Sequence, residues 1–230
     1  MKKYHLSVFI FFFVTEVLTA QNILEVRQAI DLFNTSKMLR GDLNKTLSGN
    51  DIEGSPYLAN EFINGNVYTT SGTKYVDVPL RYNIYNDNIE FDTGNGVQAL
   101  AAPEIVDRVE FGGFTMVYVP YSITKKIRRG FFILEEEGKA SLLIKPEVAF
   151  VKATKPGAYK EAEPAKFDKR PDSYYIRVGM AEAKIISGKN DIVEIFPDNR
   201  DKIEAFIKKN KIKYRKAEDL KQLVQYYNSL

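Results

Sequence analysis

The chain of 230 residues contains no cysteine and no tryptophan, and its single histidine, His5, lies near the amino terminus. Without cysteine there is no disulfide, no thiol nucleophile and no lipid-carrying cysteine. Once a leader containing His5 is removed, the chain also lacks imidazole. This excludes Ser-His-Asp and Cys-His catalytic sites, and zinc sites built on His or Cys. An enzyme would have to work with carboxylates, Lys, Tyr, Ser or Arg.

The first 20 residues have the pattern of a secretory signal peptide. Lys2 and Lys3 precede an apolar run from Leu6 to Val14, and the small residue Ala20 comes just before a polar pair. The apolar run is too short for a membrane-spanning helix, which needs roughly 20 residues. We therefore expect cleavage after Ala20 and an exported protein in the periplasm, at the outer membrane or outside the cell.

The expected mature chain is nearly balanced in charge. Removal of Lys2, Lys3 and Glu16 leaves a net charge of +2. This small excess predicts no nucleic-acid binding. The remaining chain of roughly 210 residues is long enough for one sizeable core or two small ones without disulfides.

Residues 21–60 predict a short helix followed by a polar lead-in. Ile23, Val26, Ile30 and Phe33 are spaced three or four residues apart, as on one face of a helix. From residue 39 to residue 60 the chain is rich in Gly, Asn, Asp and Ser and has no sustained period, which is typical of a loop.

Residues 61–151 predict an antiparallel β-meander, because three turn signals separate alternating segments. A turn at Asn86-Asp87 would pair two strands between Tyr75 and Phe91. Further hairpins are predicted at Gly112-Gly113 and Glu137-Gly138. The expected pairs are Ile84 with Ile89, Tyr82 with Phe91, Phe111 with Phe114, Val109 with Met116, and Ile133 with Leu142.

Residues 152–172 contain three prolines among Lys, Ala and Glu and predict an extended connector. Residues 173–230 then predict two short strands, at Tyr174–Val178 and Ala183–Ile186, and a helical tail. Helices are expected at 190–196, after an Asp198 cap, and at 217–228. The fold class is therefore α+β, mainly β: a meander followed by a small module with amphipathic helices.

The tyrosines and one neighbouring basic side chain, Arg81, are candidates for binding. Tyrosine is an ordinary strand residue, but it also suits a ligand platform. In the stretch RYNIYN, Tyr85 alternates onto the face away from the core, and we take Tyr85 and Arg81 as candidate binding residues. Packing within the sheet is the favoured interpretation for the other tyrosines.

A second candidate is the basic cluster Lys125, Lys126, Arg128 and Arg129, which lies between two predicted strands. Such a cluster suits an acidic partner, a phosphate or a lipid headgroup, but a solvated loop is the favoured interpretation. The acidic residues Glu135, Glu136 and Glu137 at the following turn are expected to balance it.

Catalysis and cofactors have little support in the sequence. Glu90 and Asp92 share one strand face, but a glycosidase needs two acids at a fixed distance across a cleft, which spacing alone does not establish. Gly94-Asn95-Gly96 is a turn signal rather than a phosphate loop. We expect no catalytic residues, no cofactor and no metal.

Three segments resemble a family of uncharacterised exported proteins from Bacteroidota. They are EGSPYLANEFINGNVYT (53–69), VPLRYNIYNDNIEF (78–91) and GAYKEAEPAKF (157–167). The resemblance covers most of the chain from about Glu53. It implies an envelope protein of a bacterium with two membranes, and it carries no active site, cofactor or substrate.

The sequence therefore predicts a non-enzymatic envelope protein that binds another protein or a cell-surface component through its sheet. The alternative is a carrier whose curved sheet encloses a lipid or another apolar ligand. Such a carrier needs an apolar cavity of several hundred Å³. A hydrolase that uses only carboxylates is the third hypothesis.

Overall fold

The computed structural model describes residues 25–27, 52–124, 126–156 and 161–230. The expected signal peptide, residues 1–20, and Lys125 lie outside the described residues. The fold is mainly β, with 49% strand and 18% helix, and it ends in three short helices. The predicted fold class is confirmed.

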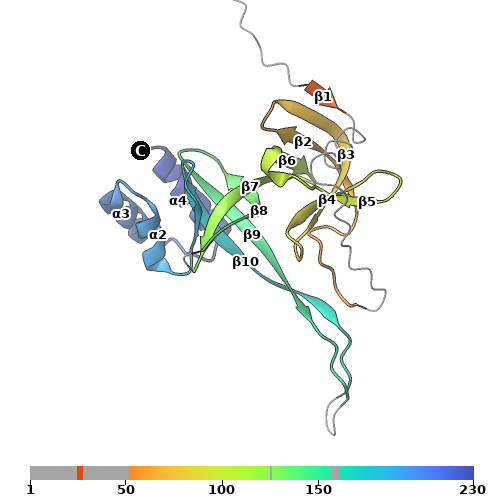
Figure 1. Ribbon diagram of the computed structural model, residues 1–230. Coiled ribbons are helices and arrows are strands. Elements are labelled where there is room, and N and C mark those ends of the chain that lie inside the picture. Colours follow the sequence, from red (N-terminus) through yellow and green to blue (C-terminus); the bar gives the residue numbers. More distant parts are fainter. Residues whose placement is uncertain (1–24, 28–51, 125, 157–160) are drawn as a thin grey trace, which may run out of the picture.

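A five-stranded barrel lies in the middle of the molecule (Figure 1). Strands β7 (Phe114–Ile123), β8 (Lys126–Glu136), β9 (Ala140–Val151) and β10 (Lys166–Val178) follow one another as an antiparallel meander. Strand β11 (Ala183–Ile185) pairs antiparallel with β10 and parallel with β7. The parallel β11–β7 pairing closes the barrel, which no sequence signal predicted.

A second group of strands continues from the barrel through β6 (Val106–Phe111), which pairs with β7. Its order is β6, β2 (Ile63–Thr69), β3 (Thr73–Asn83), β4 (Asn88–Asp92) and β5 (Val97–Ala99). A short 3-10 helix, η1 (Pro103–Ile105), leads into β6. We call these strands the N-terminal sheet.

The helix expected over residues 23–33 is not found where the chain is described. Strand β1 (Glu25–Arg27) pairs parallel with β3 at Thr73 to Tyr75. Pairing with a sheet edge outweighs the weak helical period of so short a segment. The other residues of the expected helix lie outside the described residues.

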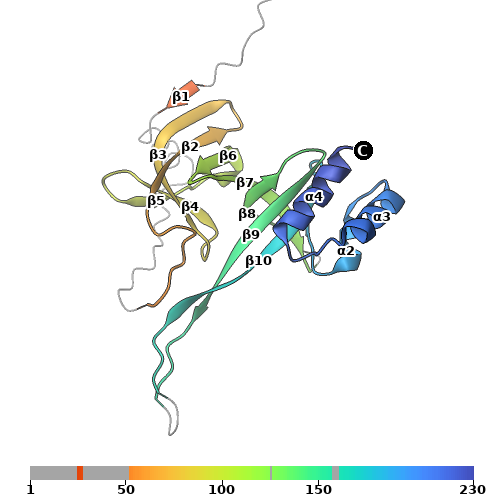
Figure 2. The same cartoon turned by 180° about the vertical axis from the view of Figure 1, so that it is seen from behind.

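Three helices pack on the barrel, on the side away from the N-terminal sheet (Figure 2). They are α2 (Lys189–Ile195), α3 (Arg200–Asn210) and α4 (Ala217–Asn228). The bounds predicted for the last helix are confirmed. Asp198 does not cap α3, which begins after Asn199. Its carboxylate instead accepts hydrogen bonds from the Tyr227 hydroxyl at 2.6 Å and the Lys139 ammonium at 3.0 Å.

Side chains that alternate along the barrel strands contribute to three separate hydrophobic cores. On β9 and β10, Leu143 and Tyr175 point into the barrel, while Leu142 and Ile176 point outward against the helices. On β8, Phe131 and Ile133 point outward against the N-terminal sheet. The period of two in a strand therefore lets the barrel carry a separate layer on each side. The barrel interior is filled by Val119, Tyr121, Phe132, Leu143, Tyr175 and Ala183.

All three predicted hairpins are present, but only one has the predicted register. The pairs around Gly112-Gly113, Phe111 with Phe114 and Val109 with Met116, are confirmed. In the β3–β4 hairpin Leu80, not Tyr82, lies opposite Phe91. A shift of two residues keeps every side chain on its predicted face, so the pattern alone cannot detect it.

The register changes coincide with contacts to residues distant in the sequence. At the β3–β4 connection the Ile84 amide donates to the carbonyl of Pro56, so Ile84 leaves the ladder and the loop lengthens. In the β8–β9 hairpin a bulge at Glu135 places Ile133 opposite Ile144, not Leu142. The Glu135 carboxylate forms an ion pair at 2.9 Å with the ammonium of Lys221 on α4. The predicted balance between Glu135 and the Lys125–Arg129 cluster is therefore wrong.

The segment predicted as a connector, 152–172, contributes to β10, which begins at Lys166. Strand β10 tolerates Pro171 because the ladder with β9 is irregular between Arg170 and Ser173. With β9 it forms a long hairpin that projects beyond the barrel (Figure 1). We call the projecting part, residues 147–151 and 166–170, the arm.

The barrel core predicts a loss of stability at high pH. Burial, and then the neighbouring Tyr121 and Glu147, raise the pKa of Tyr175 to about 12. The unfolded chain releases this proton near pH 10, so the stabilisation is complete below about pH 10 and is lost as the pH rises towards 12. We expect urea denaturation to give a falling free energy of unfolding over this range. Tyr175→Phe should make the fall smaller, and an unchanged fall would contradict this assignment.

Candidate functional site

The arm begins where β8 and β9 separate. Their pairing ends at Ile133 opposite Ile144, and the next outward-facing pair in that register would be Phe131 opposite Pro146. Proline has no amide hydrogen and cannot donate to a neighbouring strand. From this level on, β9 pairs only with β10 among the described strands, and β8 pairs only with β7. The two ladders diverge, and the arm leaves the barrel.

An ion pair occupies the point of separation. Asp87, in the β3–β4 turn, accepts a hydrogen bond from the Lys145 ammonium at 2.7 Å and another from the Phe131 amide at 3.1 Å. Lys145 also donates to the Phe131 carbonyl at 3.0 Å. The Tyr82 hydroxyl donates at 2.8 Å to Asp87 Oδ1, the same oxygen that accepts from the Phe131 amide. Two side chains thus satisfy the amide and the carbonyl of Phe131, which have no partner on β9.

The ion pair lies in a largely dry environment. The side chain of Lys145 is 13% exposed, and its ammonium lies 4.8 Å from the ring centre of Phe132. Burial lowers the pKa of Lys145, although the Asp87 charge opposes the shift. Burial and then Asp87 raise the pKa of Tyr82 well above its ordinary value. The side chain of Asp87 is 28% exposed, so loss of the Asp87 charge, which would leave the buried Lys145 ammonium without compensation, is the costlier change.

The backbone is adapted to this contact at two positions. Asp87 has φ of 51°, a left-handed conformation that Asp and Asn tolerate better than most residues. Gly130 leaves the space that the pair fills, since a Cβ there would lie 2.4 Å from an Asp87 carboxylate oxygen and 2.8 Å from the Lys145 nitrogen.

An aromatic group lies near the outer end of the arm. Phe150 and Phe167 face each other across β9 and β10, with ring centres 5.3 Å apart. Tyr85 packs edge-on against both, 6.3 Å from Phe150 and 5.3 Å from Phe167. Tyr85 remains 42% exposed and Phe150 36% exposed, while Phe167 is buried. The prediction that Tyr85 is exposed is confirmed, and the ring also packs against the arm.

One edge of the arm is covered and the other is open. Glu53 lies parallel to β10, where its amide donates to the Ala165 carbonyl and its carbonyl accepts from the Phe167 amide. Because the Phe167 amide points away from β9, the opposed pair Phe150–Phe167 lacks mutual backbone hydrogen bonds. The backbone groups of Phe150, and of Val148 two residues earlier, therefore point to the free side of β9. No described segment pairs with that edge over residues 147–151.

The candidate Arg81 lies inside the N-terminal sheet. Its guanidinium contacts Glu90 at 2.7 Å, with the two side chains 13% and 5% exposed. It also lies over the Tyr57 ring at 3.6 Å and the Phe62 ring at 4.3 Å. These contacts leave Arg81 little surface to offer to a partner, and its role is to neutralise the buried Glu90.

The basic cluster is part of a strand rather than a loop. Lys126, Arg128 and Arg129 are exposed residues of β8, paired with β7, and Lys125 lies outside the described residues. The predicted loop is wrong because β7 and β8 continue to the Ile123–Lys126 pair before the chain turns. Ile127 between these charges is 68% exposed. Among the described residues, Lys126, Arg128 and Arg129 form no hydrogen bond or ion pair with Tyr85 or Arg81.

The carboxylates considered for catalysis do not converge on a cleft. The Glu90 carboxylate accepts hydrogen bonds from the Arg81 guanidinium and from the side-chain amide of Asn83. The Asp92 carboxylate accepts one from the backbone amide of Gly94. Gly94-Asn95-Gly96 forms the predicted turn between β4 and β5.

Within residues 52–124, 126–156 and 161–230, no cluster of His, Cys, Asp or Glu is arranged to hold a metal ion. None of the helices formed by the described residues is long and apolar enough to cross a membrane.

Sequence reasoning missed the residues that build the root of the arm. Lys145 stood at the end of a predicted strand and Asp87 in a predicted turn, with no signal linking positions so far apart. Pro146, directly after Lys145, was an available signal, because proline in a strand marks an edge or an interruption.

Comparisons with protein-family models, curated proteins and solved structures found no match for this chain. The relation to exported proteins of Bacteroidota stays a prediction. The proposals below therefore rest on the geometry of the described residues.

We expect Gly130→Ala to destabilise the protein by about 2–3 kcal/mol, because the methyl group forces Asp87 and Lys145 apart and leaves buried polar groups unpaired. Guanidinium denaturation measures this effect. Gly188→Ala is the matched control, since the nearest atom to its added Cβ is 3.9 Å away. Equal stability of the two variants would show that the Asp87–Lys145 contact is not needed for folding.

Proposed function

We propose that the mature protein is a non-enzymatic exported protein that binds a partner protein by accepting an extended segment along the open β9 edge of the arm. The observation that carries the proposal is the free edge itself. Backbone groups of Val148 and Phe150 point to a side where no described strand pairs with residues 147–151. Addition of a strand to such an edge is a recurrent mode of peptide recognition, in which main-chain hydrogen bonds supply affinity.

The arm is held in place before a partner arrives. The Asp87–Lys145 pair ties its base to the N-terminal sheet, and Glu53 pairs with its other edge. Tyr85 packs on one of its faces. A binding element that is already ordered loses less conformational entropy on association, which favours affinity.

Aromatic side chains beside the edge supply a basis for specificity. Tyr85 and Phe150 are both more than one-third exposed and in contact with each other. Aromatic residues are enriched in protein interfaces because they bury a large area at modest entropic cost. A partner strand that pairs with Phe150 would place alternate side chains over this aromatic surface.

The interior of the barrel gives less support to the carrier alternative. The described barrel core is filled by its own side chains, and Phe132 and Leu143 are at most 1% exposed. A pocket of about 440 Å³ at the end of the barrel has the charged side chains Glu104, Asp107 and Arg177 in its lining. A lipid carrier needs a mostly apolar cavity of comparable size.

Photo-crosslinking in the native envelope tests the proposal. A photoreactive phenylalanine analogue at Phe150 is expected to capture a discrete partner, whereas the same analogue at the more exposed Ile127 is expected not to. Capture at Ile127 but not at Phe150 would move the interface to the basic part of β8.

Proline substitutions separate edge pairing from side-chain contact. Val148→Pro removes an amide that points to the open edge, so it should abolish the Phe150 crosslink without unfolding the arm. Val148→Ala is the control for the lost side chain and should retain the crosslink. If Val148→Pro retains the crosslink as well, the partner does not pair with the β9 edge. Should the captured protein be a second copy of the chain, light scattering of the purified protein will give a dimer.

A further inference from the structure

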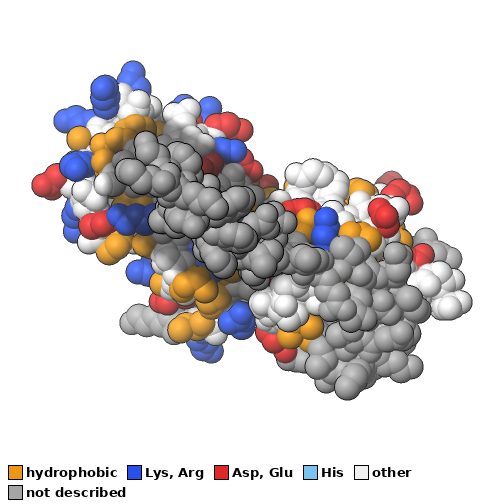
Figure 3. Space-filling view, turned by 90° about the horizontal axis from the view of Figure 1, so that it is seen from above, with side chains coloured by type: hydrophobic (Ala, Val, Ile, Leu, Met, Phe, Trp, Pro, Cys, Tyr) orange, Lys and Arg blue, Asp and Glu red, His pale blue; other side chains and the backbone are white. Residues whose placement is uncertain are grey.

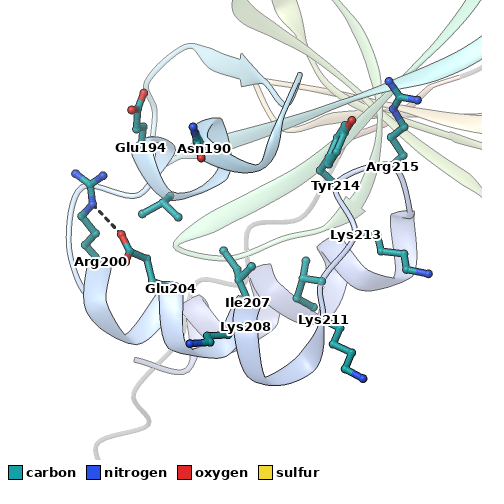
Figure 4. Close-up of a pocket in the computed structure, with 12 residues that line it drawn as sticks. Asn190, Glu194, Arg200, Glu204, Ile207, Lys208, Lys211, Lys213, Tyr214 and Arg215 are labelled. Carbon is teal, nitrogen blue, oxygen red and sulfur yellow. Dashed lines mark hydrogen bonds and ion pairs between the residues drawn. The ribbon is translucent and has the colours of Figure 1, made fainter.

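We infer that the groove between α2 and α3 is a second binding site, which takes an acidic peptide with an apolar anchor side chain. It is separate from the arm and does not depend on the function proposed above. The groove has a volume of about 1010 Å³, and Val193, Ile207 and Ile212 supply its apolar lining. Figure 4 shows α2 and α3 on its two sides, with Ile207 between them.

The rim of the groove is basic. Lys208, Lys211, Lys213 and Arg215 all line it, and all are exposed. None of the four has an ion-pair partner among the described residues. Of the other charged residues in the lining, Arg200 and Glu204 form an ion pair with each other at 3.3 Å, which leaves Glu194 as the remaining acid. The excess positive charge therefore favours an anionic ligand.

The charge is concentrated in one short segment. Between Lys208 and Lys216, six of nine residues are Lys or Arg and none is acidic. Lys208 and Lys209 lie in the last turn of α3, where positive charge stabilises the helix dipole. That explanation does not extend to Lys213 and Arg215, which follow the end of the helix. Figure 3 shows many Lys and Arg side chains at the end of the molecule formed by the helices, left in that view.

The shape of the groove favours a peptide over a membrane surface. A peripheral membrane site inserts protruding apolar side chains into the headgroup region. Here the apolar groups lie in the lining, with Ile212 only 2% exposed, and the charged side chains surround them. A narrow chain with one apolar side chain reaches the lining while its carboxylates meet the lysines.

The test uses the purified mature protein and a fluorescein-labelled peptide, Glu-Glu-Glu-Leu-Leu-Glu-Glu-Glu, followed by fluorescence anisotropy. We expect saturable binding that weakens at least about tenfold when Gln replaces Glu or when Ala replaces Leu. Binding that depends on the Glu residues but not on the Leu residues would overturn the groove as the site. Tighter binding to anionic phospholipid vesicles than to the peptide would favour a lipid surface and also overturn the inference.

Two charge-reversal pairs locate the site. Lys211→Glu with Lys213→Glu changes two lining residues, whereas Lys209→Glu with Lys216→Glu changes two residues of the same basic segment that do not line the groove. The net charge changes equally. We expect the first pair to weaken binding at least about tenfold and the second less than about threefold. Equal losses would show that only the general field of the segment attracts the peptide.

The Val148→Pro variant tests whether the groove and the arm are separate binding sites. Val148→Pro is expected to leave peptide affinity unchanged, because the arm and the groove share no residue. Loss of peptide binding in Val148→Pro would place the peptide on the β9 edge and overturn the groove as its site. Retained peptide binding in a protein that captures no partner through Phe150 would refute the proposed function alone.

Discussion

The ion pair between Asp87 and Lys145 is the contact on which the relation of the N-terminal sheet, the barrel and the arm depends. It forms where Pro146 interrupts the pairing of β8 with β9 and where the backbone of Phe131 would otherwise lack partners. Its two residues come from a turn of the N-terminal sheet and from a barrel strand. A buried pair of this kind contributes little net stability by itself, but removal of one partner is costly. Its main effect is to fix the position at which the arm leaves the barrel.

The free edge of the arm follows from the same interruption. If β8 had continued to pair with β9, the backbone groups of Val148 and Phe150 would have been used within the sheet. Natural proteins usually protect such edges, because unpaired strand backbones invite association. Here Glu53 covers one side of the arm and Tyr85 packs on one face, while the β9 side is left open among the described residues. A protected and ordered hairpin with one open edge is well suited to specific pairing.

Local signals in the sequence determined the parts of the fold that depend on neighbours in the chain. The Gly112-Gly113 turn fixed its register because both glycines adopt positive φ, and α4 was placed by its apolar face, Leu220, Leu223, Val224 and Tyr227. The β3–β4 register was predicted wrongly because a distant residue, Pro56, takes the Ile84 amide. Closure of the barrel depends on β11, which is too short to reveal its parallel partner β7. Among the candidate site residues, the exposure of Tyr85 was predictable from alternation. The burial of Arg81 depends on Glu90, Tyr57 and Phe62 and was not.

A distance measurement between the arm and the N-terminal sheet tests most directly whether Asp87 fixes the arm. The chain has no cysteine, so Lys169→Cys, at an exposed position of the arm, and Asn95→Cys, in the β4–β5 turn, provide two unique positions for spin labels. Pulsed electron–electron double resonance between the two labels should give a narrow distance distribution that broadens when Asp87→Asn is added. It should stay narrow with Asp107→Asn, which changes an exposed ion pair with Arg108. A distribution that keeps its width in Asp87→Asn would contradict the account, because the arm would then be held by other contacts.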